Sequence, residues 1–119
     1  AEPVAGTESR AGDVTEGPTV YDMKNLGKLK AVSAAAPDAM AAFWAFDAAV
    51  FQDGALPAKV KELIAVAVAV TTQCPYCIEV HAKKAKAAGA TDAELAEATL
   101  VSAAIRAGGA VTHATHAIG

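Results

Sequence analysis

The chain has 119 residues, a length that suits one domain with a modest hydrophobic core. Hydrophobic residues make up 54% of it, aromatic residues only 5%, and the net charge is −3. This acidic balance excludes an electrostatic case for binding nucleic acid. Alanine is abundant and each alanine buries little area, so we expect closely packed helices and association between copies of the chain.

The sequence predicts neither a membrane segment nor an export signal. Its longest apolar run, residues 63–70, is far too short to cross a bilayer. No basic stretch followed by an apolar one opens the chain, although without an initiator methionine a segment could have been removed. Two cysteines in a lone Cys-x-x-Cys favour reduced thiols over a structural disulfide framework, so we expect a cytoplasmic protein.

The first half of the chain predicts a flexible arm followed by two helices. Residues 1–20 mix Gly, Pro, Thr and Glu without a period, and we expect a flexible N-terminal arm there and a helical domain over residues 21–119. A weak helix is expected over residues 22–35. A second, over residues 37–52, begins at a proline and carries the large side chains, which we expect in the core or a subunit interface. They are Met40, Phe43, Trp44, Phe46, Val50 and Phe51.

The middle of the chain predicts an antiparallel helix hairpin that carries the Cys-x-x-Cys. Pro57 opens a third helix over residues 57–72. Its run 63–70 is apolar on every side, which predicts a helix buried all round. Pro75 then opens a fourth helix over residues 75–88 after a break.

The last part predicts one capped helix and a short terminal one. Thr91 and Glu94 fit a capping box at the start of a fifth helix over residues 92–107. The glycine pair 108–109 is expected to interrupt it before a short helix that ends near residue 118. The whole pattern predicts an all-α, single-domain helical bundle.

A thioredoxin-like fold is the rival interpretation, because glutaredoxins carry the same Cys-Pro-Tyr-Cys tetrapeptide after a strand. Only 42 residues follow Cys77, and they contain no proline that could supply the cis-proline of that fold. They also contain no β-branched run that could form the remaining strands. These absences favour the helical interpretation.

The two cysteines predict a redox site. Pro75 at the first helical position makes Cys74 the N-cap and places Cys77 in the first turn, where unpaired amide groups favour negative charge on sulfur. His81 lies four residues after Cys77, on the same helix face, and could accept its proton. This proximity favours Cys77 as the nucleophile and Cys74 as the resolving partner.

Glu62 is the third candidate in this site. A hairpin would bring His81 within one to two turns of it, so that the carboxylate could orient the imidazole directly or through water. The alternative is that Glu62 pairs with Lys59 or Lys61 in solvent.

Three segments together resemble the carboxymuconolactone decarboxylase/alkylhydroperoxidase D family. They are Leu-Pro-Ala-Lys-Val-Lys-Glu-Leu-Ile at 56–64, Cys-x2-Cys-x3-His at 74–81 and Ala-Gly-Ala-Thr-x2-Glu at 88–94. The spacing Glu-x11-Cys-x2-Cys-x3-His is that of the alkylhydroperoxidase D-like branch. One well-studied branch carries histidine where this chain has Tyr76, so part of that branch's proton network has no counterpart here.

The resemblance implies an all-α fold assembled into homotrimers or homohexamers and an enzyme without a cofactor. It implies a thiol-disulfide oxidoreductase with (alkyl)hydroperoxide reductase activity, acting on peroxide or disulfide substrates. Glu62 and His81 would form a proton relay, Cys77 would attack the peroxide and Cys74 would resolve it. A lipoyl-like or thioredoxin-like dithiol would then reduce the disulfide.

The histidines near the C-terminus support an alternative function. His113 and His116 lie three residues apart, and with Cys74 and Cys77 they would make a Cys2His2 set that zinc accepts. The alternative is therefore a non-catalytic metal-binding or redox-sensing protein. Ordinary exposed histidines near a helix end explain the same pair.

Overall fold

The computed structural model describes residues 21–119, so the predicted N-terminal arm, residues 1–20, lies outside the described part of the chain. Every regular element within residues 21–119 is a helix, which confirms the all-α prediction. In chain order they are η1 (Met23–Lys28), α1 (Leu29–Ala35), α2 (Pro37–Val50), α3 (Ala58–Thr72), α4 (Pro75–Ala87), α5 (Asp92–His113) and η2 (Ala114–His116). The weak helix expected over residues 22–35 is thus a 3-10 segment followed by two turns of α-helix.

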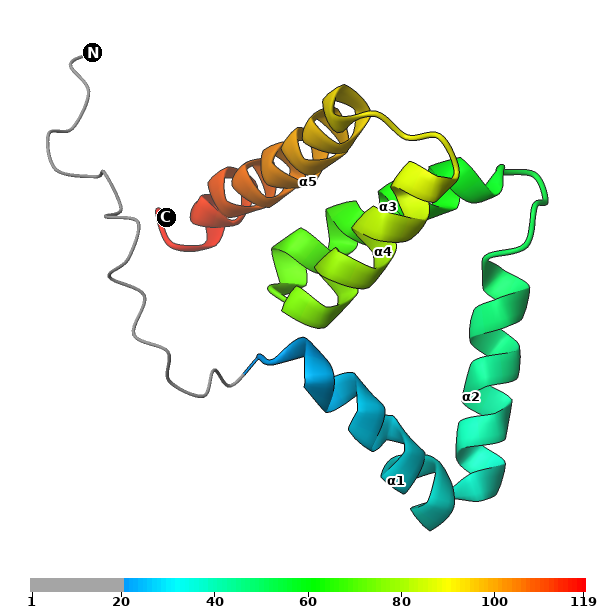
Figure 1. Ribbon diagram of the computed structural model, residues 1–119. Coiled ribbons are helices and arrows are strands. Elements are labelled where there is room, and N and C mark those ends of the chain that lie inside the picture. The colour runs from blue at the N-terminus through cyan, green and yellow to red at the C-terminus, as the bar shows by residue number, and fades with distance from the viewer. Residues whose placement is uncertain (1–20) are drawn as a thin grey trace, which may run out of the picture.

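The helices form two groups. Helix α3 packs against both α4 and α5, and these three make the body of the molecule (Figure 1). Helices α1 and α2 pack against each other at their junction and form a V beside the body (Figure 1). No helix within residues 21–119 is long and apolar enough to cross a membrane.

The sharp turn between α3 and α4 places the cysteines. Gln73 ends α3 in the left-handed conformation, with φ 58° and ψ 45°. The N–H of Cys74 then donates to the carbonyl of Ala69 at 3.1 Å. Pro75 occupies the first turn of α4, where its missing N–H costs no hydrogen bond. Because the reversal takes only two residues, α4 runs back along α3 as the predicted hairpin.

The capping box at the start of α5 is confirmed. The Thr91 hydroxyl accepts from the Glu94 N–H at 3.1 Å, and the Glu94 carboxylate accepts from the Thr91 N–H at 3.0 Å. Gly89, with φ 97°, makes the turn that precedes it. The local residues therefore determine where α5 begins.

The predicted interruption at the glycine pair is wrong. Helix α5 continues through Gly108 and Gly109 to His113, and only the 3-10 segment η2 follows. A glycine in a helix costs about 1 kcal/mol relative to alanine but does not forbid helical geometry. Sixteen helical residues precede the pair, so extension needs no new nucleation.

The core of a single chain is thin, and the expectation that α3 is buried all round is wrong for one copy. Among the described residues the buried apolar side chains are Val66, Ala69, Ala85 and Ala90. Val68 of α3 is 54% exposed, because among the described helices α3 packs mainly against α4 and α5. The aromatic side chains of α2 are not core residues either: Phe46 is 67% exposed. Within residues 21–119, large apolar side chains of α2, α3 and α5 are thus left exposed.

Candidate active site

The structure brings Glu62 and His81 into direct contact. Oε2 of Glu62 lies 2.6 Å from Nδ1 of His81, with Glu62 on α3 and His81 on α4. Glu62 is only 7% exposed, so its alternative role as a solvated partner of a lysine is wrong. Lys59 pairs instead with Glu94 at 2.8 Å. A carboxylate that accepts the Nδ1 proton leaves Nε2 as the nitrogen that can exchange a proton.

Phe51 is a site residue that the sequence did not identify. Its ring lies parallel to the imidazole of His81, with centroids 5.1 Å apart and an interplanar angle of 19°. It was expected only as one of the large side chains of the second helix. Its position at the C-cap of α2, just before the turn into α3, is the feature that could have indicated a role in the site.

The two cysteines lie side by side at the start of α4. Their Sγ atoms are 2.6 Å apart, and both are free thiols. Cys74 is the N-cap of α4, and its sulfur accepts from the Cys77 N–H at 3.3 Å. Disulfide formation needs the sulfurs to approach to about 2.05 Å, a small movement from this arrangement.

The two cysteines differ in how readily their thiols ionise. The hydrogen bond from the Cys77 thiol lowers the pKa of Cys74, and the Cys77 backbone N–H lowers it further. The same hydrogen bond to Cys74, together with burial and the charge on Cys74, raises the pKa of Cys77 to about 11. Cys74 is therefore the first of the two to become a thiolate. This order opposes the expectation, drawn from His81 alone, that Cys77 ionises more easily.

Cys77, rather than Cys74, is the cysteine that a substrate can reach. A cavity of about 530 Å³ holds both Cys77 and His81 in its wall, and Cys74 does not line it. Apolar and aromatic side chains form most of the remaining wall, with one acidic and one basic residue. They are Leu26, Leu29, Phe43, Trp44, Asp47, Tyr76, Val80 and Lys84. A substrate in this cavity would thus meet Cys77 first.

Tyr76, between the cysteines, holds the N-terminal segment against the site. Its hydroxyl accepts a hydrogen bond from Nδ2 of Asn25 at 3.0 Å. The ring of Tyr21 meets the Tyr76 ring edge to face, with centroids 5.8 Å apart. Leu26 and Leu29 of the same segment line the cavity, so this segment forms part of its wall.

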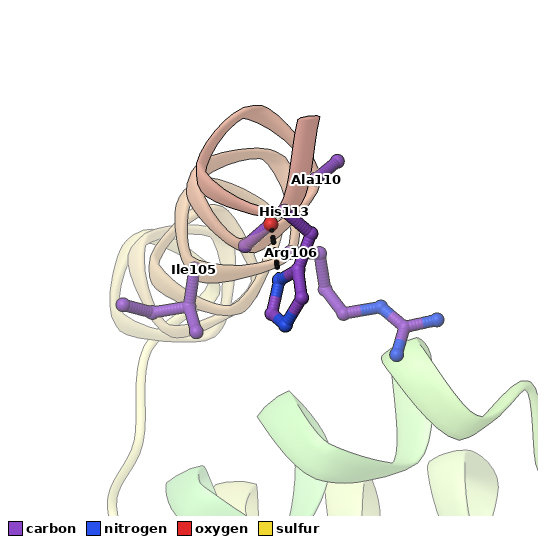
Figure 2. Close-up of a pocket in the computed structure, with 5 residues that line it drawn as sticks. Ile105, Arg106, Ala110 and His113 are labelled. Atoms are coloured by element: carbon purple, nitrogen blue, oxygen red, sulfur yellow. Dashed lines mark hydrogen bonds between the residues drawn. The ribbon is translucent and has the colours of Figure 1, made fainter. Parts of the chain in front are cut away.

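The C-terminal histidines lie apart from this site. His113 and His116 are neighbours, with ring centroids 6.0 Å apart. The Nδ1–H of His113 donates to the Gly109 carbonyl at 2.7 Å, as Figure 2 shows, beside a second cavity of about 440 Å³ formed by α5 alone. Across residues 21–119 no three His, Cys, Asp or Glu side chains lie close enough to hold a metal ion. Within one chain Cys74, Cys77, His113 and His116 therefore do not form a metal site.

Comparison with known proteins agrees with this fold. A model of the carboxymuconolactone decarboxylase family matches residues 37–118, and the chain belongs to this family. The resemblance inferred from the sequence is thereby confirmed, and the family takes its name from an enzyme.

Individual relatives come from several prokaryotes. A protein of Paracoccus denitrificans, described as uncharacterized protein 4 in the cox locus, is 48% identical over 93 residues, which cover 78% of this chain and 81% of the relative. A crystal structure from Methanobacterium thermoautotrophicum is 40% identical with a TM-score of 0.67, covering 71% of this chain and 94% of that one. The apo form of a carboxymuconolactone decarboxylase family protein from Legionella pneumophila is 36% identical with a TM-score of 0.63, covering 67% and 71%.

Proposed function

We propose that this protein is a thiol-disulfide oxidoreductase that reduces hydroperoxides through Cys74 and Cys77. The observation that carries the proposal is the Glu62–His81 pair at 2.6 Å, in which His81 shares a cavity wall with Cys77. A buried carboxylate that orients an imidazole beside an accessible thiol is an arrangement suited to moving a proton. Membership of a family with alkylhydroperoxidase D-like members supports the same reaction class.

The first step would be the attack of Cys77 on the hydroperoxide. Nε2 of His81 takes the Cys77 proton as the sulfur attacks the terminal peroxide oxygen, and the O–O bond breaks. Cys77 becomes a sulfenic acid, and the leaving alkoxide takes the proton back from His81 and departs as an alcohol. This base is needed because the pKa of Cys77 is raised to about 11 by its hydrogen bond to Cys74.

The backbone N–H of Cys77, which donates to the Cys74 sulfur and lowers its pKa, is still present in the second step. The Cys74 thiolate attacks the Cys77 sulfenic acid, the disulfide forms, and hydroxide leaves and is protonated to water. The sulfurs already lie 2.6 Å apart. An external dithiol then attacks the accessible Cys77 sulfur, and Cys74 leaves as a thiolate that the Cys77 backbone N–H stabilises. We propose a lipoyl-like or thioredoxin-like dithiol as this reductant.

Peroxide consumption with a dithiol reductant tests the proposal. We expect the wild type to consume an organic hydroperoxide, and Cys77→Ser to lose that activity while keeping its helical content. Thr112→Ala, at an exposed position near the end of α5, is the control and should keep the activity. A wild type that neither consumes hydroperoxide nor reduces a disulfide would contradict the proposed function.

We also propose that the protein is a homotrimer or homohexamer. Ile64 and Val68 of α3 and Val101 and Ile105 of α5 line an open apolar cavity of about 310 Å³, and Ile105 is 73% exposed. Exposed apolar faces of this kind are typical of surfaces that a second copy covers. Light scattering after size exclusion should give three or six chains, and Ile105→Glu should reduce that number. A monomeric wild type at micromolar concentration would contradict this assembly.

A further inference from the structure

His81 has two different partners, one at the edge of its ring and one stacked on it. Glu62 meets the edge of the imidazole at Nδ1, and Phe51 covers one face of it at a centroid distance of 5.1 Å. The hydrogen bond by itself still allows the ring to tilt about its Cβ–Cγ bond, since terminal torsions of this type are broad. A parallel ring opposes that tilt, because turning the imidazole would drive its edge into Phe51.

The backbone on both sides of Phe51 is fixed to the helix that carries Glu62. Nζ of Lys61 donates to the Val50 carbonyl at 2.7 Å and also to the Gln52 carbonyl. These carbonyls belong to the residues immediately before and after Phe51. Directly after Gln52, the Asp53 carboxylate accepts from the Ala58 N–H at 2.7 Å. The end of α2 and the start of α3 are therefore joined by three hydrogen bonds around this ring.

We propose that Phe51 is a positioning residue for His81 and that Lys61 anchors it. Adjacent residues of α3 then act on the same imidazole by two routes, Glu62 directly and Lys61 through Phe51. The result is a single ring orientation, with Nδ1 on Glu62 and Nε2 left for the Cys77 proton. The catalytic consequence rests on the proposed function, whereas the orientation of the ring does not.

Nuclear magnetic resonance of 15N-histidine-labelled protein tests the orientation without any activity assay. An Nδ1–H held against Glu62 should give a proton resonance that exchanges slowly with water, and His81→Gln identifies it among the three histidines. In Phe51→Leu, which keeps apolar bulk but removes the ring, we expect exchange to accelerate by about tenfold. Phe51→Tyr should restore slow exchange, and Lys61→Met should accelerate it less than Phe51→Leu does.

Phe46→Leu is the matched control, because it removes a ring from α2 that is 67% exposed and lies outside the site. The inference is overturned if Phe51→Leu exchanges at the wild-type rate, if Phe46→Leu accelerates exchange equally, or if the wild type shows no protected Nδ1–H. In hydroperoxide turnover, Phe51→Leu should lower kcat about tenfold and leave KM within about twofold. Absence of turnover in the wild type would defeat the proposed function, while the exchange rates would still decide the role of Phe51.

Discussion

Glu62 and His81 stand nineteen positions apart in the chain and meet at 2.6 Å between Oε2 and Nδ1, across the α3–α4 hairpin. Their side chains are 9% and 17% exposed, so the pair is largely shielded from water. A shielded carboxylate is unfavourable unless a hydrogen bond compensates for its lost hydration. Here the imidazole supplies that bond, and the carboxylate in return determines which imidazole nitrogen holds the proton.

Removing the charge of Glu62 should slow the reaction. Glu62→Gln keeps a carbonyl oxygen that can accept from Nδ1, but it no longer stabilises a protonated imidazole. We expect hydroperoxide turnover to fall by about 10²-fold, the lower end of what general acid–base catalysis contributes. Steady-state kinetics measure this. Glu79→Gln, which loses only an exposed pair with Lys83, should retain activity, and equal loss in both variants would contradict the relay.

Trapping a sulfenic acid should identify the attacking cysteine. In Cys74→Ser the Cys77 sulfenic acid cannot condense to a disulfide, so we expect a dimedone adduct on Cys77 after one equivalent of hydroperoxide. Mass spectrometry of the labelled peptide measures it. In Cys77→Ser we expect little adduct on Cys74, since Cys74 does not line the cavity. An adduct confined to Cys74 would reverse the two roles.

The two thiols should ionise in well-separated steps. The pKa of Cys74 is lowered by the hydrogen bond from Cys77, so one thiolate should form at a lower pH than in a free cysteine. The pKa of Cys77 is raised to about 11, so the second should form only near that pH. Ultraviolet absorbance of thiolate against pH measures both.

Replacing one cysteine at a time tests how each thiol changes the pKa of the other. Cys77→Ala removes the thiol that donates to Cys74, so the pKa of Cys74 should rise. Cys74→Ala removes the group that raises the pKa of Cys77, so the pKa of Cys77 should fall. If both thiols ionise together at the value of a free cysteine, the described pairing does not exist in solution.

Replacing Gly108 or Gly89 by alanine should change the stability of the fold in opposite directions, because the two glycines have different backbone conformations. Gly108 is helical and a Cβ added there meets nothing within 4 Å, so Gly108→Ala should stabilise the fold by about 0.5–1 kcal/mol. Gly89 has φ 97°, which an alanine adopts poorly, so Gly89→Ala should destabilise by about 1 kcal/mol or more. Urea denaturation measures both, and a loss of stability in Gly108→Ala would argue for a real break in α5.

The capping box of α5 should contribute measurably to stability. Thr91→Ala removes the hydroxyl that accepts from the Glu94 N–H, and we expect a loss of about 1 kcal/mol in the free energy of unfolding. Thr112→Ala, near the other end of the same helix and exposed, should change it by less than about 0.5 kcal/mol. Equal effects from the two variants would show that the cap is not the cause.

Much of the local structure follows from short patterns. Prolines at 37 and 75 and the capping box at 91–94 mark helix starts, and each is where a helix begins. Such signals act within one turn of the backbone, so a sequence displays them directly. The glycine pair in α5 misled for the same reason: its local preference was outweighed by the helix already formed before it.

The sequence by itself determined where α4 and α5 begin, the place of the cysteines at the N-terminus of α4 and the position of His81 on the helix face of Cys77, because each depends on spacing within one helix. Only the tertiary structure decided that Glu62 touches His81 directly, that Phe51 covers the ring and that Cys77 rather than Cys74 lines the cavity. These contacts join different helices, and their distances depend on how the turns at 51–57 and 73–74 aim those helices. Spacing along the chain carries no such information.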